Sequence, residues 1–361
     1  MTKATGSDRS DGKGLRFIIL GAGAVGCYVG ARLTHAGHTV CFVGRPHVLQ
    51  PLATMGLQIS GNDGLDTLIQ PAQISLMESL QDAVSFMASQ PAKPGAVEDN
   101  PVVLVCVKTT AIDTVALDIA AQCPAATTVV SLQNGVDNST RLLAGAPKMT
   151  VLAGVVAFNV VWRSANHVHQ TNNGPLLIQQ DPASEEFAPA FRLAGLPLEL
   201  SRDMEAIKWG KLLVNLLNPV NALSNVPLRD VLLQRDFRRV LAALTDEGLR
   251  ALNAAGICPA KIGDAPPPKL FSVVLRSPNW LFVRLASKAM RMDPAARASM
   301  CEDLQNGKPT EVDDLCGAVV RLGRLHGVAT PLNQIMCDLI HQYQPGQSWS
   351  GQRLLAALNL R

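Results

Sequence analysis

Residues 16–26, Arg16-Phe-Ile-Ile-Leu-Gly21-Ala-Gly23-Ala-Val-Gly26, join a compact apolar run to three glycines spaced GxGxxG, and a helical pattern follows to about His35. In such a strand–turn–helix unit the first glycine permits a tight turn. The second lets the backbone approach a pyrophosphate, and the third allows the helix to pack closely on the strand. A lone GxGxxG is weak evidence, because glycines cluster in any tight turn. Here a second strand-like run, Thr39–Val43, completes the βαβ context.

The sequence therefore predicts a dinucleotide site in which the pyrophosphate lies on free N–H groups at a helix N-terminus. The candidate cofactor-binding residues in this motif are Gly21, Gly23, Ala24, Val25 and Gly26.

The end of the second strand indicates which dinucleotide is bound. An NAD enzyme commonly has an acidic residue there, which accepts hydrogen bonds from the ribose hydroxyls. This chain has Gly44-Arg45 instead, and a guanidinium can pair with a 2′-phosphate. The alternative is that Arg45 only ends the strand in solvent. The sequence favours NADPH/NADP as the cofactor.

The remaining pattern predicts two domains within the 361 residues. Further buried strands are expected at Val102–Val107 and Thr127–Leu132, with helical stretches between strands, as in a parallel sheet. Residues 88–100 are expected to form a loop. Strand-like runs continue to about residue 200, after which the pattern is helical. We predict an α/β fold: a disordered tail at 1–15, a Rossmann-type NADP-binding domain at 16–200 and an all-helical substrate-binding domain at 201–361.

Composition and charge exclude several classes of function. The net charge is +3 with no long run of one sign, which argues against a nucleic-acid partner. The eight cysteines lie far apart without a CxxC pair, so we expect no metal site and a reducing compartment. The apolar run Val151–Trp162 is too short to span a bilayer, so we expect no membrane association and a cytoplasmic location. The pattern does not fix the oligomeric state, and a homodimer is compatible with it.

Polar residues recur within an apolar helical stretch in the C-terminal half. Lys211, Asn215 and Asn218 fall at i, i+4 and i+7, which would place them on one helical face. Burying such groups without partners costs roughly 1–3 kcal/mol each, so the face suits a polar cavity that holds a ligand. The alternative is an exposed face with two ordinary Asn residues.

Glu311 is a second candidate. It follows a turn, with Thr310 as the predicted N-cap of the next helix, and it shares a face with Leu315, Ala318 and Leu322. A Glu in a first helical turn is normally only a partner of the helix dipole, and the pattern alone does not separate the two roles.

Over roughly residues 16 to 340 the chain resembles the ketopantoate reductase (2-dehydropantoate 2-reductase) family. The matching motifs, in order, are GAGAVG at 21–26, Val107-Lys108-Thr109, Gln133-Asn134-Gly135-Val136, Trp209-Gly-Lys211-Leu-Leu-Val-Asn215, Ser299-Met300, Thr310-Glu311-Val-Asp313 and His326-Gly-Val-Ala-Thr-Pro331.

The resemblance implies roles for individual residues. Lys211 would be the general acid and Glu311 would hold it by a charge-assisted hydrogen bond. Ser299 would bind the substrate carboxylate and Asn215 the substrate hydroxyl. The remaining implied roles concern Asn218, which would share the hydroxyl contact with Asn221 as its rival, and Lys108 and Asn134, which would lie on the cofactor side.

The activity implied is NADPH-dependent reduction of 2-dehydropantoate to (R)-pantoate, in pantothenate and coenzyme A biosynthesis. Two alternatives are reduction of another branched 2-keto acid, and a non-catalytic module that senses NADP(H). Ala296 cannot make a side-chain hydrogen bond where some family members carry polar substrate contacts, which leaves the exact keto acid open. Residues 258–292 look expanded relative to compact family members, and we expect them to reshape the substrate pocket.

Overall fold

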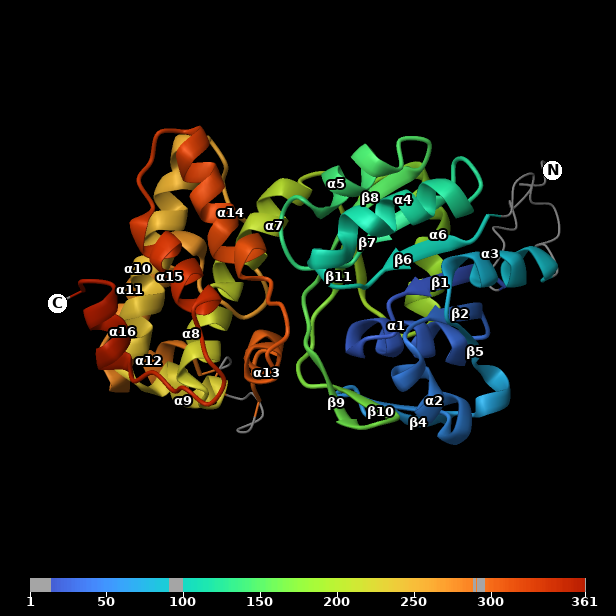
Figure 1. The fold of residues 1–361 in the computed structure, drawn as a ribbon, viewed down its shortest axis with the longest axis horizontal. Helices are drawn as coiled ribbons and strands as arrows, with labels where there is room; N and C mark the ends of the chain where they lie inside the picture. Colours follow the sequence, from blue (N-terminus) through green and yellow to red (C-terminus); the bar gives the residue numbers. More distant parts are fainter. Residues whose placement is uncertain (1–13, 91–99, 288–289, 291–295, 361) are drawn as a thin grey trace, which may run out of the picture. The chain divides into compact units, whose positions relative to one another are not determined.

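The computed structural model describes residues 14–90, 100–287, 290 and 296–360. Within these ranges the chain forms two compact units (Figure 1). The first contains residues up to Val107, Thr114–Leu132 and Leu142–Arg202. The second contains Asp203–Arg361 together with two short segments from earlier in the chain, Lys108–Asp113 and Gln133–Arg141.

The first unit is built on an eight-stranded sheet with the order β12-β11-β8-β7-β6-β1-β2-β5. Its strands are β1 (Arg16–Leu20), β2 (Thr39–Val43), β5 (Ser75–Met77), β6 (Val102–Val105), β7 (Thr128–Ser131), β8 (Thr150–Val156), β11 (Leu176–Gln179) and β12 (Leu198–Ser201). Neighbouring strands run parallel except β8 and β11. Because β1 lies between β2 and β6, the strand order reverses there, and ligands of such sheets bind beyond the carboxyl end of that point.

A second, four-stranded sheet was not foreseen from the sequence. Its order is β4-β3-β10-β9, and its strands are β3 (Leu57–Ser60), β4 (Asp66–Ile69), β9 (Val160–Ser164) and β10 (His167–Gln170). Helix α1 (Ala24–His35) contacts strands of both sheets. The Tyr28 hydroxyl on α1 donates to Gln170 Oε1 at 2.8 Å, in a core that is otherwise mainly aliphatic.

Besides α1, the first half of the chain contains the helices α2 (Pro46–Met55), η1 (Pro71–Gln73), α3 (Leu80–Ser89), η2 (Thr109–Ala111), α4 (Ile112–Gln122), α5 (Asn138–Gly145) and α6 (Pro182–Leu193). The predicted loop at 88–100 begins later than expected, because α3 continues to Ser89. Its residues 91–99, and residues 1–13 of the predicted tail, lie outside the described residues.

The second unit is helical. Its helices are α7 (Met204–Asn215), α8 (Leu217–Ser224), α9 (Leu228–Leu233), α10 (Arg235–Ala254), α11 (Pro268–Arg276), α12 (Asn279–Leu285), α13 (Ser299–Gln305), α14 (Val312–Leu325), α15 (Pro331–His341) and α16 (Gly351–Ala357). The long helix α10 is central, since α8, α9, α11, α14, α15 and α16 all pack against it. The predicted fold class, a Rossmann-type α/β domain followed by a helical domain, is confirmed.

Two details of the helical half differ from the prediction. The stretch from Lys211 to Asn218 is not one helix, because α7 ends at Asn215 and α8 starts at Leu217. Pro219 has no N–H to donate to the carbonyl of Asn215, which accounts for the break. The predicted N-cap Thr310 is also wrong: Glu311 takes that position before α14, without capping through its side chain.

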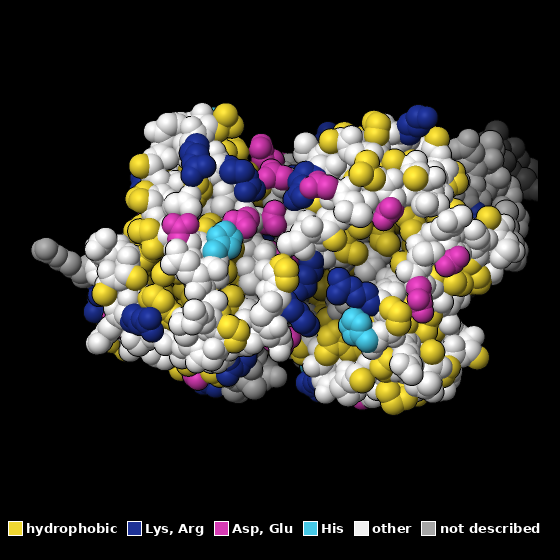
Figure 2. All heavy atoms as spheres, in the orientation of Figure 1, with side chains coloured by type: hydrophobic (Ala, Val, Ile, Leu, Met, Phe, Trp, Pro, Cys, Tyr) yellow, Lys and Arg dark blue, Asp and Glu magenta, His cyan; other side chains and the backbone are white. Residues whose placement is uncertain are grey.

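Charged side chains of both signs are mixed on the surface. On the face drawn in Figure 2, Lys and Arg side chains are interspersed with Asp and Glu side chains. None of the helices in the described part of the chain combines the length and apolar character needed to cross a membrane.

Candidate active site

The glycine-rich loop of the first unit has the backbone that its sequence predicts. Gly21 has φ of +116°, and a Cβ there would lie 2.7 Å from the backbone nitrogen of Val107. A Cβ at Gly26 would lie 2.2 Å from the carbonyl oxygen of Gly21 and 2.8 Å from Ile19 Cγ2. Both glycines are thus required by packing within the protein itself, one in the turn and one where α1 crosses β1.

Gly23 differs from its two neighbours in the motif. It is exposed, it is the N-cap of α1, and a Cβ there would meet nothing within 4 Å. The first turn of α1 has no acidic residue and no side-chain cap, so its N-terminal N–H groups are available to an anion. Open space beside a helix N-terminus is what a pyrophosphate needs, and Ala24, Val25 and Gly26 begin that helix. The loop fits a dinucleotide.

Arg45 lies directly after β2, where the sequence placed it. It is exposed and is the N-cap of α2, with Pro46 following at the first helical position. Across the described ranges, no side chain forms an ion pair with its guanidinium. The group is therefore free to pair with a phosphate.

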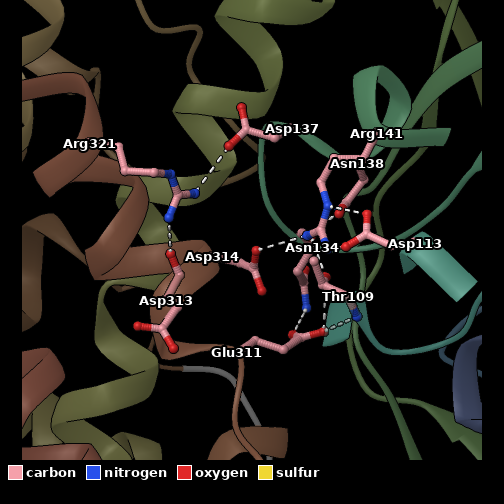
Figure 3. Close-up of polar contacts among 10 residues, drawn as sticks. All are labelled: Thr109, Asp113, Asn134, Asp137, Asn138, Arg141, Glu311, Asp313, Asp314 and Arg321. Atoms are coloured by element: carbon pink, nitrogen blue, oxygen red, sulfur yellow. Dashed lines mark hydrogen bonds and ion pairs between the residues drawn. The ribbon is translucent and has the colours of Figure 1, made fainter. Parts of the chain in front are cut away.

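The remaining candidate residues belong to the second unit, where Glu311 is at the centre of a hydrogen-bond cluster (Figure 3). Its Oε1 accepts from the backbone N–H and from Oγ1 of Thr109, both at 3.3 Å. Its Oε2 accepts from Asn134 Nδ2 at 3.2 Å. Residues about 200 positions apart in the chain are thereby brought together.

Asn134 extends this cluster to α7. Its Oδ1 accepts from Nδ2 of Asn215 at 3.2 Å, and its backbone carbonyl accepts from Thr109 Oγ1 at 3.0 Å and from Asn138 Nδ2. The side chain of Asn134 therefore faces Glu311 with its donor end and Asn215 with its acceptor end. This contact places Asn134 beside a proposed substrate residue as well as beside a proposed catalytic one.

Lys211 lies one helical turn before Asn215 on α7. Among the residues that the structure describes, none makes a hydrogen bond or ion pair with its Nζ. Burial lowers the pKa of Lys211 to about 8. The hydrogen bond expected between Lys211 and Glu311 is not formed in this structure, so the carboxylate does not offset the effect of burial on the pKa of Lys211.

Lys208, three residues earlier, is bonded in a different way. Its Nζ donates to the backbone carbonyl of Val136 at 2.7 Å, and burial lowers its pKa. Lys208 thus holds the segment that contains Asn134, whereas the ammonium of Lys211 is free. The geometry separates two lysines that periodicity alone could not distinguish.

The two rival asparagines of α8 also differ. Asn221 is fully buried and satisfied on both sides: its Nδ2 donates to the Val226 carbonyl at 2.6 Å, and its Oδ1 accepts from the backbone N–H of Ala298 at 2.9 Å. Asn218 is half-buried, and within the described part of the chain its side chain has no hydrogen-bond partner. Asn221 therefore has a structural role, whereas the side-chain amide of Asn218 can bind a ligand.

Ser299 and Lys108 complete the set of predicted residues. Ser299 is exposed at the first position of α13, directly after the residue that Asn221 holds. Lys108 is exposed and pairs with Asp303 on the same helix, α13.

Sequence reasoning missed several members of this cluster. Thr109 lies inside a recognised motif but received no role, although it makes two of the hydrogen bonds to Glu311. Asp303 was not singled out. Arg141, Asp113 and Asp314 were not considered, because charged residues at the starts of helices are ordinary in any sequence.

Comparison with known proteins finds the same family along most of the chain. The family model of ketopantoate reductase PanE/ApbA matches residues 17–182, and the model of its C-terminal part matches residues 203–344. A 2-dehydropantoate 2-reductase from Archaeoglobus fulgidus is 29% identical over 337 residues, 92% of this chain and 98% of the relative. The crystal structure of a PanE/ApbA family ketopantoate reductase from Ralstonia eutropha JMP134 has a TM-score of 0.73 at 28% identity, covering 91% of this chain and 97% of that one.

D-mandelate dehydrogenase, solved with NADH and anilino(oxo)acetate, shares the fold, with a TM-score of 0.71 at 19% identity over 96% of this chain and 100% of that one. The family match and the curated relatives define an oxidoreductase that uses a nicotinamide dinucleotide. More narrowly, the chain belongs to the ketopantoate reductase family.

Proposed function

We propose that this protein reduces 2-dehydropantoate to (R)-pantoate with NADPH, a step toward pantothenate and coenzyme A, with Lys211 as the proton donor. The names of the curated relatives support the substrate. The observation that carries the catalytic assignment is the half-buried ammonium of Lys211, which has no partner among the described residues and lies one turn from Asn215. A partly desolvated charge without a partner is costly, so its presence fits a group that serves chemistry.

In this proposal the cofactor pyrophosphate lies on the N-terminus of α1, held by Gly21, Gly23, Ala24, Val25 and Gly26. The guanidinium of Arg45 pairs with the 2′-phosphate. Lys108 and Asn134 stay assigned to the cofactor side of the site. When bound, the nicotinamide supplies the hydride.

Lys211 protonates the substrate ketone oxygen as it becomes an alkoxide. A lysine with its pKa near 8 is a stronger acid than an exposed one, yet remains mostly protonated at neutral pH. Its position on a helix fixes the ammonium relative to Asn215, so the proton and the substrate contact come from one rigid element.

Glu311 acts on the substrate through two amides. Its carboxylate can only accept hydrogen bonds, so it fixes the NH₂ of Asn134 toward itself. The oxygen of Asn134 then accepts from Asn215 Nδ2, which leaves the oxygen of Asn215 to accept from the substrate hydroxyl. The direction of each amide in this chain follows from the single carboxylate at its end.

Asn218 and Ser299 supply further contacts in the proposal. The unpartnered amide of Asn218 shares the substrate hydroxyl, while its rival Asn221 holds the backbone at Ala298, where α13 starts. Ser299, at the first position of that helix, offers its hydroxyl and the helix N-terminus to the substrate carboxylate.

The test is steady-state kinetics with NADPH across a panel containing 2-dehydropantoate, other branched 2-keto acids and benzoylformate. We expect the highest kcat/KM for 2-dehydropantoate. A higher kcat/KM for another acid would replace the substrate and keep the chemistry. Binding of NADPH without turnover of any acid would overturn the enzymatic assignment in favour of a sensor.

A further inference from the structure

A second set of contacts joins the same three segments that Glu311 joins. Arg141, on the first turn of α5, makes a two-pronged hydrogen bond with Asp113: Nε to Oδ1 at 2.9 Å and Nη2 to Oδ2 at 2.6 Å. Its third nitrogen, Nη1, lies 3.7 Å from Asp314 Oδ1. Asp113 is in the first turn of α4, and Asp314 is in the first turn of α14 (Figure 3).

The two sets are parallel. Glu311 connects the residues that precede these helices: Thr109 before α4, Asn134 before α5 and Glu311 itself before α14. Arg141 connects the first turns of α4, α5 and α14, three to seven residues further along the chain than the residues that Glu311 connects. One planar guanidinium therefore fixes the spacing of three helix starts, and the hydrogen bonds to Glu311 depend on that spacing.

Charge and burial agree with this role. Burial raises the pKa of Asp314 to about 6; the Arg141 guanidinium acts against this rise, and the neighbouring Glu311 carboxylate adds to it. Asp314 and Glu311 therefore repel each other at neutral pH; Arg141, which is paired with Asp314, compensates for this repulsion more strongly than Arg321 does. Arg321 also reaches α14, through the Asp313 carbonyl at 2.8 Å and to Asp137 at 3.0 Å, but none of its contacts involves α4.

We propose that Arg141 is a positioning residue for the reaction: by joining Asp113 to Asp314 it holds the Glu311 carboxylate against Thr109 and Asn134. Through the amide chain this fixes the direction of Asn215. The proposal rests on the proposed function for its kinetic consequence, but the geometric consequence at Thr109 stands apart from any substrate.

The kinetic test is a double-mutant cycle with Arg141→Ala and Glu311→Gln. Arg141→Ala alone should lower kcat about tenfold or more, because small displacements of catalytic groups are costly, while the Kd for NADPH is unchanged. In the Glu311→Gln background the same change should alter kcat by no more than about twofold, since the contact it supports is already altered. Equal losses in both backgrounds would show that Arg141 acts elsewhere and would overturn the proposal.

Two further variants keep the proposal testable if Arg141→Ala folds poorly. Asp113→Asn weakens the contact from its other end at a largely exposed carboxylate, and should lower kcat in the same direction. Arg321→Ala removes a cation from the same cluster without touching α4, and should leave kcat close to the parent. A larger loss for Arg321→Ala than for Asp113→Asn would contradict the role of the contact to α4.

Hydrogen–deuterium exchange separates failure of this proposal from failure of the proposed function. The Thr109 amide donates to Glu311, so peptides covering residues 108–113 should exchange faster in Arg141→Ala and Asp113→Asn than in the parent or in Arg321→Ala. This readout needs no substrate. Unchanged exchange would overturn the positioning role even if the parent turns over 2-dehydropantoate. Faster exchange in these two variants, together with a parent that turns over no keto acid, would support the positioning role and overturn only the proposed function.

Discussion

The glycine-rich loop and the Glu311 cluster are built in opposite ways. The loop comes from eleven consecutive residues, 16–26, and in the proposed function it binds the cofactor with backbone N–H groups. The Glu311 cluster comes from segments near residues 109, 134, 215 and 311, and it works through side chains. Binding through the backbone requires glycines, because a Cβ would occupy the space of the ligand. Binding through side chains requires that each donor of the cluster faces the correct acceptor. The two regions should therefore fail differently under mutation.

The largest effect is expected at Lys211. Lys211→Ala removes the proton donor and should lower kcat by roughly 10²–10⁴, with little change in the Kd for NADPH. Lys208→Ala is the matched control on the same helix. It loses only a bond to the Val136 carbonyl and should be mild. Measured kcat and Kd for both variants decide this, and an indispensable Lys208 with a dispensable Lys211 would show that the family motif is misaligned here.

The pH dependence of the parent enzyme sharpens the same point. In the proposed mechanism protonated Lys211 is the active form for reduction, and burial lowers its pKa to about 8 from the ordinary 10.5. The rate of reduction should therefore fall as the pH rises through about 8. A rate that stays constant to pH 10 would mean either that Lys211 regains its ordinary pKa in the complex or that it is not the acid.

The next effect concerns the carboxylate. Glu311→Gln keeps the shape but turns one acceptor into a donor that faces the NH₂ of Asn134. The side-chain amide of Asn134 must then flip or lose this hydrogen bond, and the side-chain amide of Asn215 is no longer held in one orientation. Loss of a hydrogen bond to a charged group costs about 1.5–3 kcal/mol, so kcat/KM for the keto acid should drop roughly 10- to 100-fold. Steady-state kinetics measure the drop in kcat/KM, and a thermal melt shows whether the variant is folded. Normal turnover would reduce Glu311 to a structural residue.

In the glycine-rich loop, the effects of a mutation on stability and on NADPH binding can be separated. Gly26→Ala forces a Cβ against Gly21 O and should cost about 1–3 kcal/mol of stability. Gly23→Ala meets no protein atom, so its Tm should stay near the parent value while NADPH binds about tenfold more weakly, because the Cβ occupies the space of the pyrophosphate. Unchanged NADPH affinity in Gly23→Ala would remove the pyrophosphate from this position.

The smallest effect is expected at Arg45, which is exposed. The parent should prefer NADPH, and Arg45→Asp should narrow or reverse that preference. Since an exposed charge pair contributes up to about 1 kcal/mol, the ratio of affinities should change by about fivefold. Fluorescence titration with both dinucleotides measures it. Equal affinities in the parent would show that Arg45 plays no part in the choice.

This contrast also explains what the sequence could predict. Strands β1 and β2 were predicted with the bounds that the structure has, because each is a compact apolar run beside a glycine motif. The small sheet was missed because LQIS, DTLI and HVHQ are four-residue strands, too short and too polar for their alternation to stand out in the sequence. Pairing between β3 and β10, more than 100 residues apart, leaves no local signal.

In the cluster, the family motifs identified Glu311, Asn134 and Asn215 individually, but not their connections. Periodicity placed Lys211 and Asn218 on one continuous helix, and Pro219 ends that continuity. The contact between Lys211 and Glu311 was expected from the family resemblance alone, and it is not formed in this structure. The pairing of donors and acceptors depends on the conformation of loops such as the one that contains Thr109. Contacts between distant parts of the folded chain determine that conformation, so the local sequence does not reveal it.

The free ammonium of Lys211 has a consequence for how this protein could evolve. A lysine whose pKa is lower in the folded than in the unfolded chain costs no stability above pH 10.5; the cost grows as the pH falls and is complete below about pH 8. At neutral pH the half-buried charge of Lys211 opposes folding by at most about 3 kcal/mol. Selection for thermostability alone would replace Lys211 with an apolar residue such as methionine, so a thermostabilised library must be screened for turnover as well as for survival.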